Sequence, residues 1–190
     1  MTRHSSLPSL FRSHPSYFTF TFTLQTSHFE LRTQTSMPTL AHLWHRLHPL
    51  PGGTWLFSRI LGWMVPYTGT IGAHVRELGS GRARVTLRDR RRVRNHLNSI
   101  HAVALVNLGE VTSGLAMLMI LPSGVQSIVT GLTIEYEKKA RGTLTATSTV
   151  TLPPAITEEI TVDVTAEIHN AEDEIVARIR VTWRLRPSPP

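Results

Sequence analysis

The feature that most limits the fold is a stretch of twenty residues, 102–121, that carries a single charge, on Glu110. On length alone this stretch suits a membrane span. Glu110, Asn107, Thr112 and Ser113 would then lie deep in lipid, where an ionised carboxylate costs on the order of several kcal/mol. A helix enclosed by the protein's own sheet explains the same composition without that cost. We therefore expect a buried central helix and no stable membrane span.

The segments on both sides of this stretch alternate between apolar and polar residues, as half-buried strands do. Two strands precede the helix, around 71–75 and 83–87, with a turn at Gly79–Gly81, and four follow it, at 128–136, 144–152, 160–168 and 175–185. The helix itself is predicted over 96–121, ended by Pro122. The pattern predicts an α+β domain over 67–187, with a six-stranded antiparallel sheet wrapped around one long helix.

Two further segments precede this domain. Residues 1–36 hold many Ser and Thr but one acid and no sustained apolar stretch, so we expect them to be disordered and outside the fold. They are either an extension upstream of a start at Met37 or an organelle transit peptide. The first interpretation gives a cytoplasmic protein and the second a mitochondrial one.

Residues 37–66 predict a flap of two short amphipathic helices, about 39–48 and 54–63, separated by prolines and glycines. His42, His45 and His48 recur every third residue, which invites a metal interpretation. No carboxylate accompanies them, so a solvated helix face is favoured and no metal site or other cofactor is expected.

The composition excludes some chemistry and favours an anionic partner. The chain has no cysteine, so disulfides, thiolate metal sites and cysteine nucleophiles are all excluded. The net charge of +7 suits nucleic acid, acidic lipid or the phosphates of a coenzyme, and does not choose among them.

The start of the predicted helix carries a recognisable spacing. Asn95 is followed six residues later by His101, which precedes Ala102 and Val103, and Glu110 comes nine residues after the histidine. This spacing resembles hotdog-fold thioesterases of the phenylacetate-pathway type, which carry Asn, then His-Gly-Gly, then Asp or Glu nine residues after the His. Ala102 and Val103 stand where that family has its glycine pair.

The resemblance, which covers about residues 67–186, implies a hotdog fold and a homodimer or homotetramer. It also implies a catalytic role for Glu110, with Asn95 and His101 at the other motif positions. The backbone N–H of Ala102 would hold the thioester oxygen. Asn107, three residues before Glu110, could hydrogen-bond the carboxylate, and Thr112 and Ser113 could supply contacts to substrate through water.

Helix geometry adds a separate constraint. Nine residues at 100° each place His101 and Glu110 on opposite sides of a helix, about 13.5 Å apart along its axis. The two cannot reach one carbonyl from the same chain, whereas a two-fold dimer can bring the helix start of one subunit to the mid-helix of the other. This geometry favours a composite site at a dimer interface.

An arginine-rich run leads into the helix start. Seven arginines lie between Arg82 and Arg94, opposed only by Asp89. Those on the strand suit a solvated face. The last four could instead bind coenzyme A phosphates while the thioester reaches the helix: Arg90, Arg91, Arg92 and Arg94. No aromatic interleaving or recognised nucleic-acid motif accompanies the run, so no nucleic-acid partner is expected.

These observations favour an enzyme that hydrolyses acyl thioesters of coenzyme A or an acyl carrier. Two alternatives stay open: a non-catalytic hotdog protein that binds acyl-CoA or lipid, and a basic protein that binds nucleic acid or a membrane surface.

Overall fold

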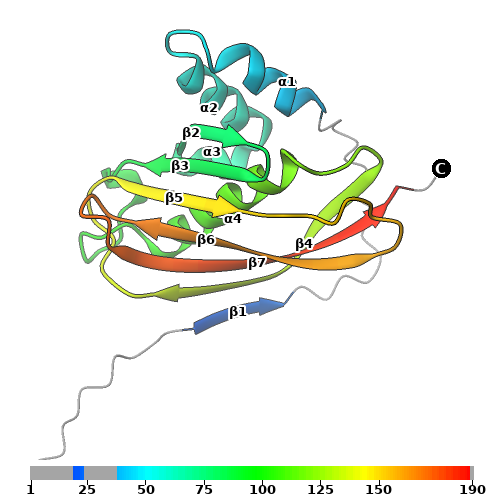
Figure 1. Ribbon diagram of the computed structural model, residues 1–190. Coiled ribbons are helices and arrows are strands. Elements are labelled where there is room, and N and C mark those ends of the chain that lie inside the picture. The colour runs from blue at the N-terminus through cyan, green and yellow to red at the C-terminus, as the bar shows by residue number, and fades with distance from the viewer. Residues whose placement is uncertain (1–18, 24–37, 189–190) are drawn as a thin grey trace, which may run out of the picture.

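One long helix lies against the inner face of a curved antiparallel sheet in the computed structural model, which describes residues 19–23 and 38–188 (Figure 1). The helices are α1 (Pro38–Leu47), α2 (Gly53–Met64), α3 (Pro66–Ile71), the short 3-10 helix η1 (Arg91–Val93) and the central α4 (Ala102–Leu118). The strands are β1 (Thr19–Thr23), β2 (His74–Gly79), β3 (Arg82–Leu87), β4 (Val125–Tyr136), β5 (Leu144–Thr149), β6 (Ile160–His169) and β7 (Ile175–Pro187).

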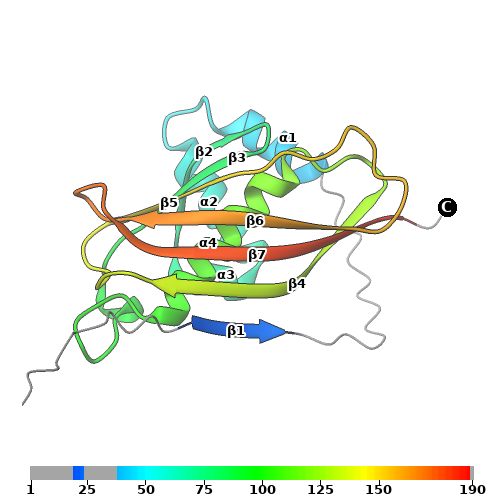
Figure 2. The same ribbon diagram turned by 60° about the horizontal axis from the view of Figure 1, so that its bottom comes forward.

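The sheet contains the six predicted strands and one more. Its order is β1-β4-β7-β6-β5-β3-β2, with every neighbouring pair antiparallel. The additional strand, β1, pairs with Gly131–Glu135 of β4 (Figure 2). It belongs to the segment 1–36 that we expected to lie outside the fold, so that expectation was wrong for Thr19–Thr23, although these residues, TFTFT, alternate as a strand does. Residues 1–18 and 24–37 lie outside the described part.

The two-residue alternation of the strands produces the apolar inner face, as predicted. On β7, for example, Ala177, Ile179, Val181 and Leu185 are fully buried, and the intervening arginines are more accessible. Helix α4 packs chiefly against β3, β5, β6 and β7. Because both the helix and the strands are apolar where they meet, one continuous core forms between them.

Two predicted element boundaries were wrong. The helix begins at Ala102 rather than at residue 96, because Asn98 has a positive φ of 52° that no helix continues. Ile71, predicted to begin a strand, instead ends α3. That helix has Pro66 in its first turn and is capped by Gly72, which is left-handed, so β2 begins only at His74.

Helices α1 and α2 correspond to the two short helices predicted over 37–66, and they form a hairpin that stands beyond the β2 edge of the sheet (Figure 1). Their inner sides join the core through Trp44 and Phe57, whose rings meet edge to face at 5.0 Å. Within the described residues, no helix is both long enough and apolar enough to cross a membrane.

Candidate active site at the start of the central helix

His101 is the N-cap residue of α4. Its ring Nδ1 accepts a hydrogen bond from the backbone N–H of Val103 at 3.2 Å, and its carbonyl accepts from Ala104 and Leu105. Since Nδ1 is an acceptor, the neutral ring must carry its proton on Nε2. His101 therefore fixes the helix start and keeps one N–H donor to offer.

Asn95 shapes the loop before the helix instead. Its side-chain oxygen accepts from the backbone N–H groups of Leu97 and Ser99, which closes a tight turn. Two hydrogen bonds then tie this loop to the connection between β4 and β5: the Ile100 N–H and the Ser99 hydroxyl both donate to the carbonyl of Ala140. The position of the helix start thus depends on residues some forty positions later.

One backbone donor at the helix start is unused. The first N–H groups of any helix lack an intrahelical acceptor. At α4 the N–H of Val103 bonds the His101 ring and the next two bond the His101 carbonyl, but Ala102 N–H has no acceptor among the described residues. It lies at the positive end of the helix dipole on an exposed residue. This is the donor that the sequence proposed for the thioester oxygen.

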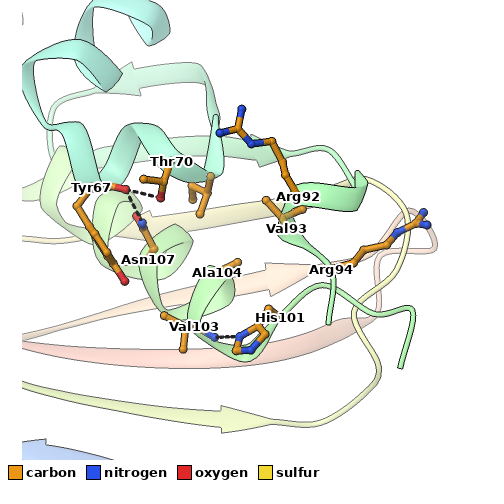
Figure 3. Close-up of a pocket in the computed structure, with 10 residues that line it drawn as sticks. Tyr67, Thr70, Arg92, Val93, Arg94, His101, Val103, Ala104 and Asn107 are labelled. Carbon is orange, nitrogen blue, oxygen red and sulfur yellow. Dashed lines mark hydrogen bonds between the residues drawn. The ribbon is translucent and has the colours of Figure 1, made fainter. Parts of the chain in front are cut away.

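A hollow of about 400 Å³ opens beside this helix start (Figure 3). Its lining residues are Tyr67, Thr70, Ile71, Arg92, Val93, Arg94, His101, Val103, Ala104 and Asn107. Four of them, Arg92, Arg94, His101 and Asn107, are predicted site residues. The lining has two guanidinium groups and no carboxylate, so it suits an anionic ligand.

Asn107 does not hold Glu110, contrary to the prediction. Its amide nitrogen donates to the carbonyl of Tyr67 at 3.2 Å, which joins α4 to the start of α3, and its buried amide oxygen has no hydrogen-bond partner among the described residues (Figure 3). Asn107 therefore positions the wall of the hollow that Tyr67 and Thr70 provide.

The four arginines have different roles. Arg90 donates to the carbonyls of Ile71 and Gly72 at 2.7 and 3.1 Å, so it caps the end of α3 rather than facing a ligand. Arg94 pairs with Asp89, lowering the pKa of that carboxyl, and turns away from Arg92 (Figure 3). Arg91 and Arg92 are exposed with no ion-pair partner among the described residues, and only Arg92 of these two lines the hollow.

Glu110 is half-buried and lies outside the hollow. Its carboxylate has no hydrogen-bond or ion-pair partner in the described part of the chain, and burial raises its pKa. Val103, Val106 and Glu110, at positions i, i+3 and i+7, are the part of the helix surface that the chain's own sheet leaves partly open. Glu110 is thus a desolvated acid in an apolar stripe, without the arginine that a structural ion pair would need.

Thr112 and Ser113 do not contact the hollow. Both are fully buried, and their hydroxyls donate to the carbonyls of Leu108 and Glu110 on the same helix. This back-bonding satisfies them without any substrate.

Three residues near the start of α4 were not predicted as site residues from the sequence. Tyr67 and Thr70 reach the hollow only because α3 packs across α4, and their residue types gave no signal. Tyr136 donates its hydroxyl to the carbonyl of Ala102 at 3.3 Å, and burial raises the pKa of the phenol. Its place at the end of β4 could have been anticipated only from the sheet order.

The central helix, the curled sheet and the strand order define a hotdog fold, as the sequence predicted. Within that class, the chain belongs to the family DUF4442, a domain of unknown function, whose model matches residues 53–185. A search of curated proteins found no match.

Solved structures share the fold. A structural-genomics protein is 28% identical with a TM-score of 0.69, covering 80% of this chain and 99% of its own. A Pseudomonas aeruginosa protein described as a probable thioesterase is 19% identical with a TM-score of 0.62, and the match covers 73% of this chain and 97% of that protein. A Haemophilus influenzae thioesterase is 17% identical with a TM-score of 0.57, and the match covers 67% of this chain and 88% of that protein.

Proposed function

We propose that this protein hydrolyses acyl thioesters, of coenzyme A or an acyl carrier, at a composite site between two copies of the chain. The observation that carries the proposal is the pair of unused groups on α4: the N–H of Ala102 at the helix start and the carboxylate of Glu110 eight residues later, neither of which has a partner among the described residues. The descriptions of the fold neighbours as thioesterases support the same reaction.

The two groups suit the two halves of the reaction. A thioester carbonyl gains negative charge as it is attacked, and an N–H at a helix start stabilises that charge. A carboxylate near the carbonyl carbon either attacks it directly, forming a mixed anhydride as the thiolate leaves, or takes a proton from an attacking water. Both routes need Glu110 ionised.

A second copy explains why the two groups lie apart in one chain. Ala102 and Glu110 are eight residues apart, about 12 Å along the helix. Val103, 51% exposed, and Val106 precede the acid on the open stripe of α4, and a two-fold partner laid on that stripe would cover them. The helix start of that partner would then face Glu110.

The hollow supports a substrate with an anionic head. Arg92 has no ion-pair partner among the described residues, and the His101 ring has a free Nε2–H. We assign the coenzyme phosphates to Arg91 and Arg92. Arg90 and Arg94 leave the binding set, because α3 and Asp89 already engage them.

Thiol release from a panel of short, medium, long and aromatic acyl-CoA compounds tests the proposal. Glu110→Gln keeps the size of the side chain and removes the carboxylate, and we expect kcat to fall on the order of 10²–10⁴-fold. Ser113→Ala is the matched control on the same helix, because its hydroxyl bonds only the helix. Wild-type turnover by Glu110→Gln would reject the assignment, and saturable coenzyme A binding without any turnover would favour a non-catalytic binding protein.

A further inference from the structure

We propose that the outer face of α2 is a membrane-docking surface that binds anionic phospholipid and holds the protein at the bilayer interface. This proposal does not depend on the reaction at α4. The docking face is defined by six residues: Trp55, Leu56, Arg59, Trp63, Met64 and Val65.

The docking face is apolar where a solvated helix would be polar. Trp55 and Trp63 are 59% and 83% exposed, and Leu56, Met64 and Val65 are exposed beside them. The opposite side of α2 buries Phe57 and Leu61 in the core, so the helix is apolar on both sides for different reasons. Contiguous exposed apolar surface of this kind marks an interaction site.

The spacing of the residues places the docking face along one side of α2. Trp55, Arg59 and Trp63 follow one another at i, i+4 and i+8, so they form one stripe along α2, with Leu56 next to it. Indole rings are enriched at the level of lipid headgroups, since they present an apolar body and one N–H donor. An arginine between two tryptophans can bury its stem and keep its guanidinium among phosphates.

The charge of the surrounding segment matches an anionic surface. Residues 38–71, which make up α1 to α3, contain no Asp or Glu, whereas they include Arg46, Arg59 and three histidines. Arg59 has no ion-pair partner among the described residues, and the whole chain carries a net charge of +7. An acid-free helix hairpin with exposed tryptophans is typical of a helix lying in the membrane interface.

The position of the α1–α2 hairpin leaves α2 accessible to a membrane surface. The α1–α2 hairpin stands beyond the β2 edge, so α2 can meet a flat surface without the sheet intervening (Figure 1). The exposed apolar surface continues to Tyr67, which is both 68% exposed and a wall of the hollow. A bilayer beneath α2 would therefore lie next to the opening at the start of α4.

Vesicle co-sedimentation of the full chain tests the proposal. We expect binding to phosphatidylcholine vesicles that contain phosphatidylglycerol, and at least roughly tenfold weaker binding to phosphatidylcholine alone. Replacing both tryptophans, Trp55→Ser with Trp63→Ser, should weaken binding to the anionic vesicles by roughly tenfold or more, because two exposed rings lose their apolar burial.

A charge-matched pair separates docking from simple attraction between opposite charges. Arg59→Glu and Arg82→Glu change the net charge equally, and both arginines are exposed, but Arg82 lies on β3. We expect Arg59→Glu to abolish most vesicle binding and Arg82→Glu to reduce it only slightly. Equal losses in the two variants would overturn the docking face.

Two further outcomes would also overturn the proposal. One is a wild-type protein that does not sediment with anionic vesicles. The other is self-association through α2. In that case light scattering would find a smaller species for the double tryptophan variant than for the wild type, and the wild type would not bind vesicles. Retained far-UV and near-UV circular dichroism shows that each variant is folded.

Discussion

Glu110 is the residue whose ionisation most directly opposes folding. Burial raises its pKa above the ordinary value of 4.5 and no described residue compensates the charge. Between the unfolded and folded pKa values the folded state holds more protons than the unfolded one, so the free energy of unfolding falls as pH rises through that window. A carboxylate kept at this cost, in a position where glutamine would fit, is more consistent with function than with stability.

Glu110→Gln should therefore make the monomer fold more stable. We expect a higher Tm than the wild type at neutral pH, with the difference disappearing as pH is lowered past the unfolded pKa, where both side chains are neutral. Thermal unfolding of both proteins between pH 4 and pH 8 measures this. A variant less stable than the wild type at neutral pH would mean that the carboxylate has a stabilising partner.

At the scale of elements, the contact between α4 and β7 depends on the absence of a side chain at Gly109. A Cβ on this residue would lie 2.0 Å from Cγ2 of Ile179, which is buried in the middle of β7. Helix and sheet approach too closely there for any larger residue. The same helix has a second glycine, Gly114, where a Cβ would meet only the Trp183 ring at 3.4 Å.

These two glycines predict opposite effects of the same substitution. Gly109→Ala should destabilise the protein by roughly 1–3 kcal/mol through overpacking. Gly114→Ala should be neutral or stabilising by up to about 1 kcal/mol, because alanine favours the helix and finds ordinary contact distances. Urea unfolding of both variants gives the comparison, and equal free energies of unfolding would contradict the packing at Ile179.

Elements defined by contacts between residues close in sequence could be predicted, whereas elements defined by contacts between distant residues could not. The strands after α4 were predictable because a two-residue period is local and most inner residues are apolar. The start of α4 was not, since the turn at Asn95 is locked by Ala140, some forty residues away. The first strand was predicted to begin too early because Ile71, the last residue of α3, shares a parity with Val75 that the left-handed Gly72 interrupts.

The candidate site likewise combines residues that lie close in sequence with residues that only the folded chain brings together. Glu110, His101 and the Ala102 N–H were proposed because their spacing resembles a known family motif, and their catalytic roles stay predictions. Tyr67 and Thr70 come from α3, whose packing across α4 the sequence did not reveal. The arginines had the right charge, but Arg90 and Arg94 are engaged by groups that only the folded chain brings near.

At the scale of the whole molecule, the composite site makes a prediction about mixed dimers. Ala102 is the first residue of α4 and follows a residue in extended conformation, so Ala102→Pro fits the backbone and removes only the N–H. Ala102→Pro and Glu110→Gln should each be inactive alone. A purified dimer containing one of each should recover about half of the wild-type activity, since it retains one complete site.

Differently tagged chains, co-expressed and purified in two steps, provide that mixed dimer for the thiol-release assay. Ala102→Ser, which keeps the N–H, is the control for the proline variant. A mixed dimer with no recovered activity would show that both groups act within one chain, and a stable, active monomer by light scattering would lead to the same conclusion.

The strand order has a kinetic consequence. The strand β7, at the carboxyl end of the fold, lies between β4 and β6, so residues such as Val129 and Trp183 pair across more than fifty positions. During synthesis, β4 therefore leaves the ribosome well before β7, the strand that joins it to β6 and the rest of the sheet. The apolar residues of β4 must wait for β7, which makes slow, cooperative closure of the sheet the expected course of folding.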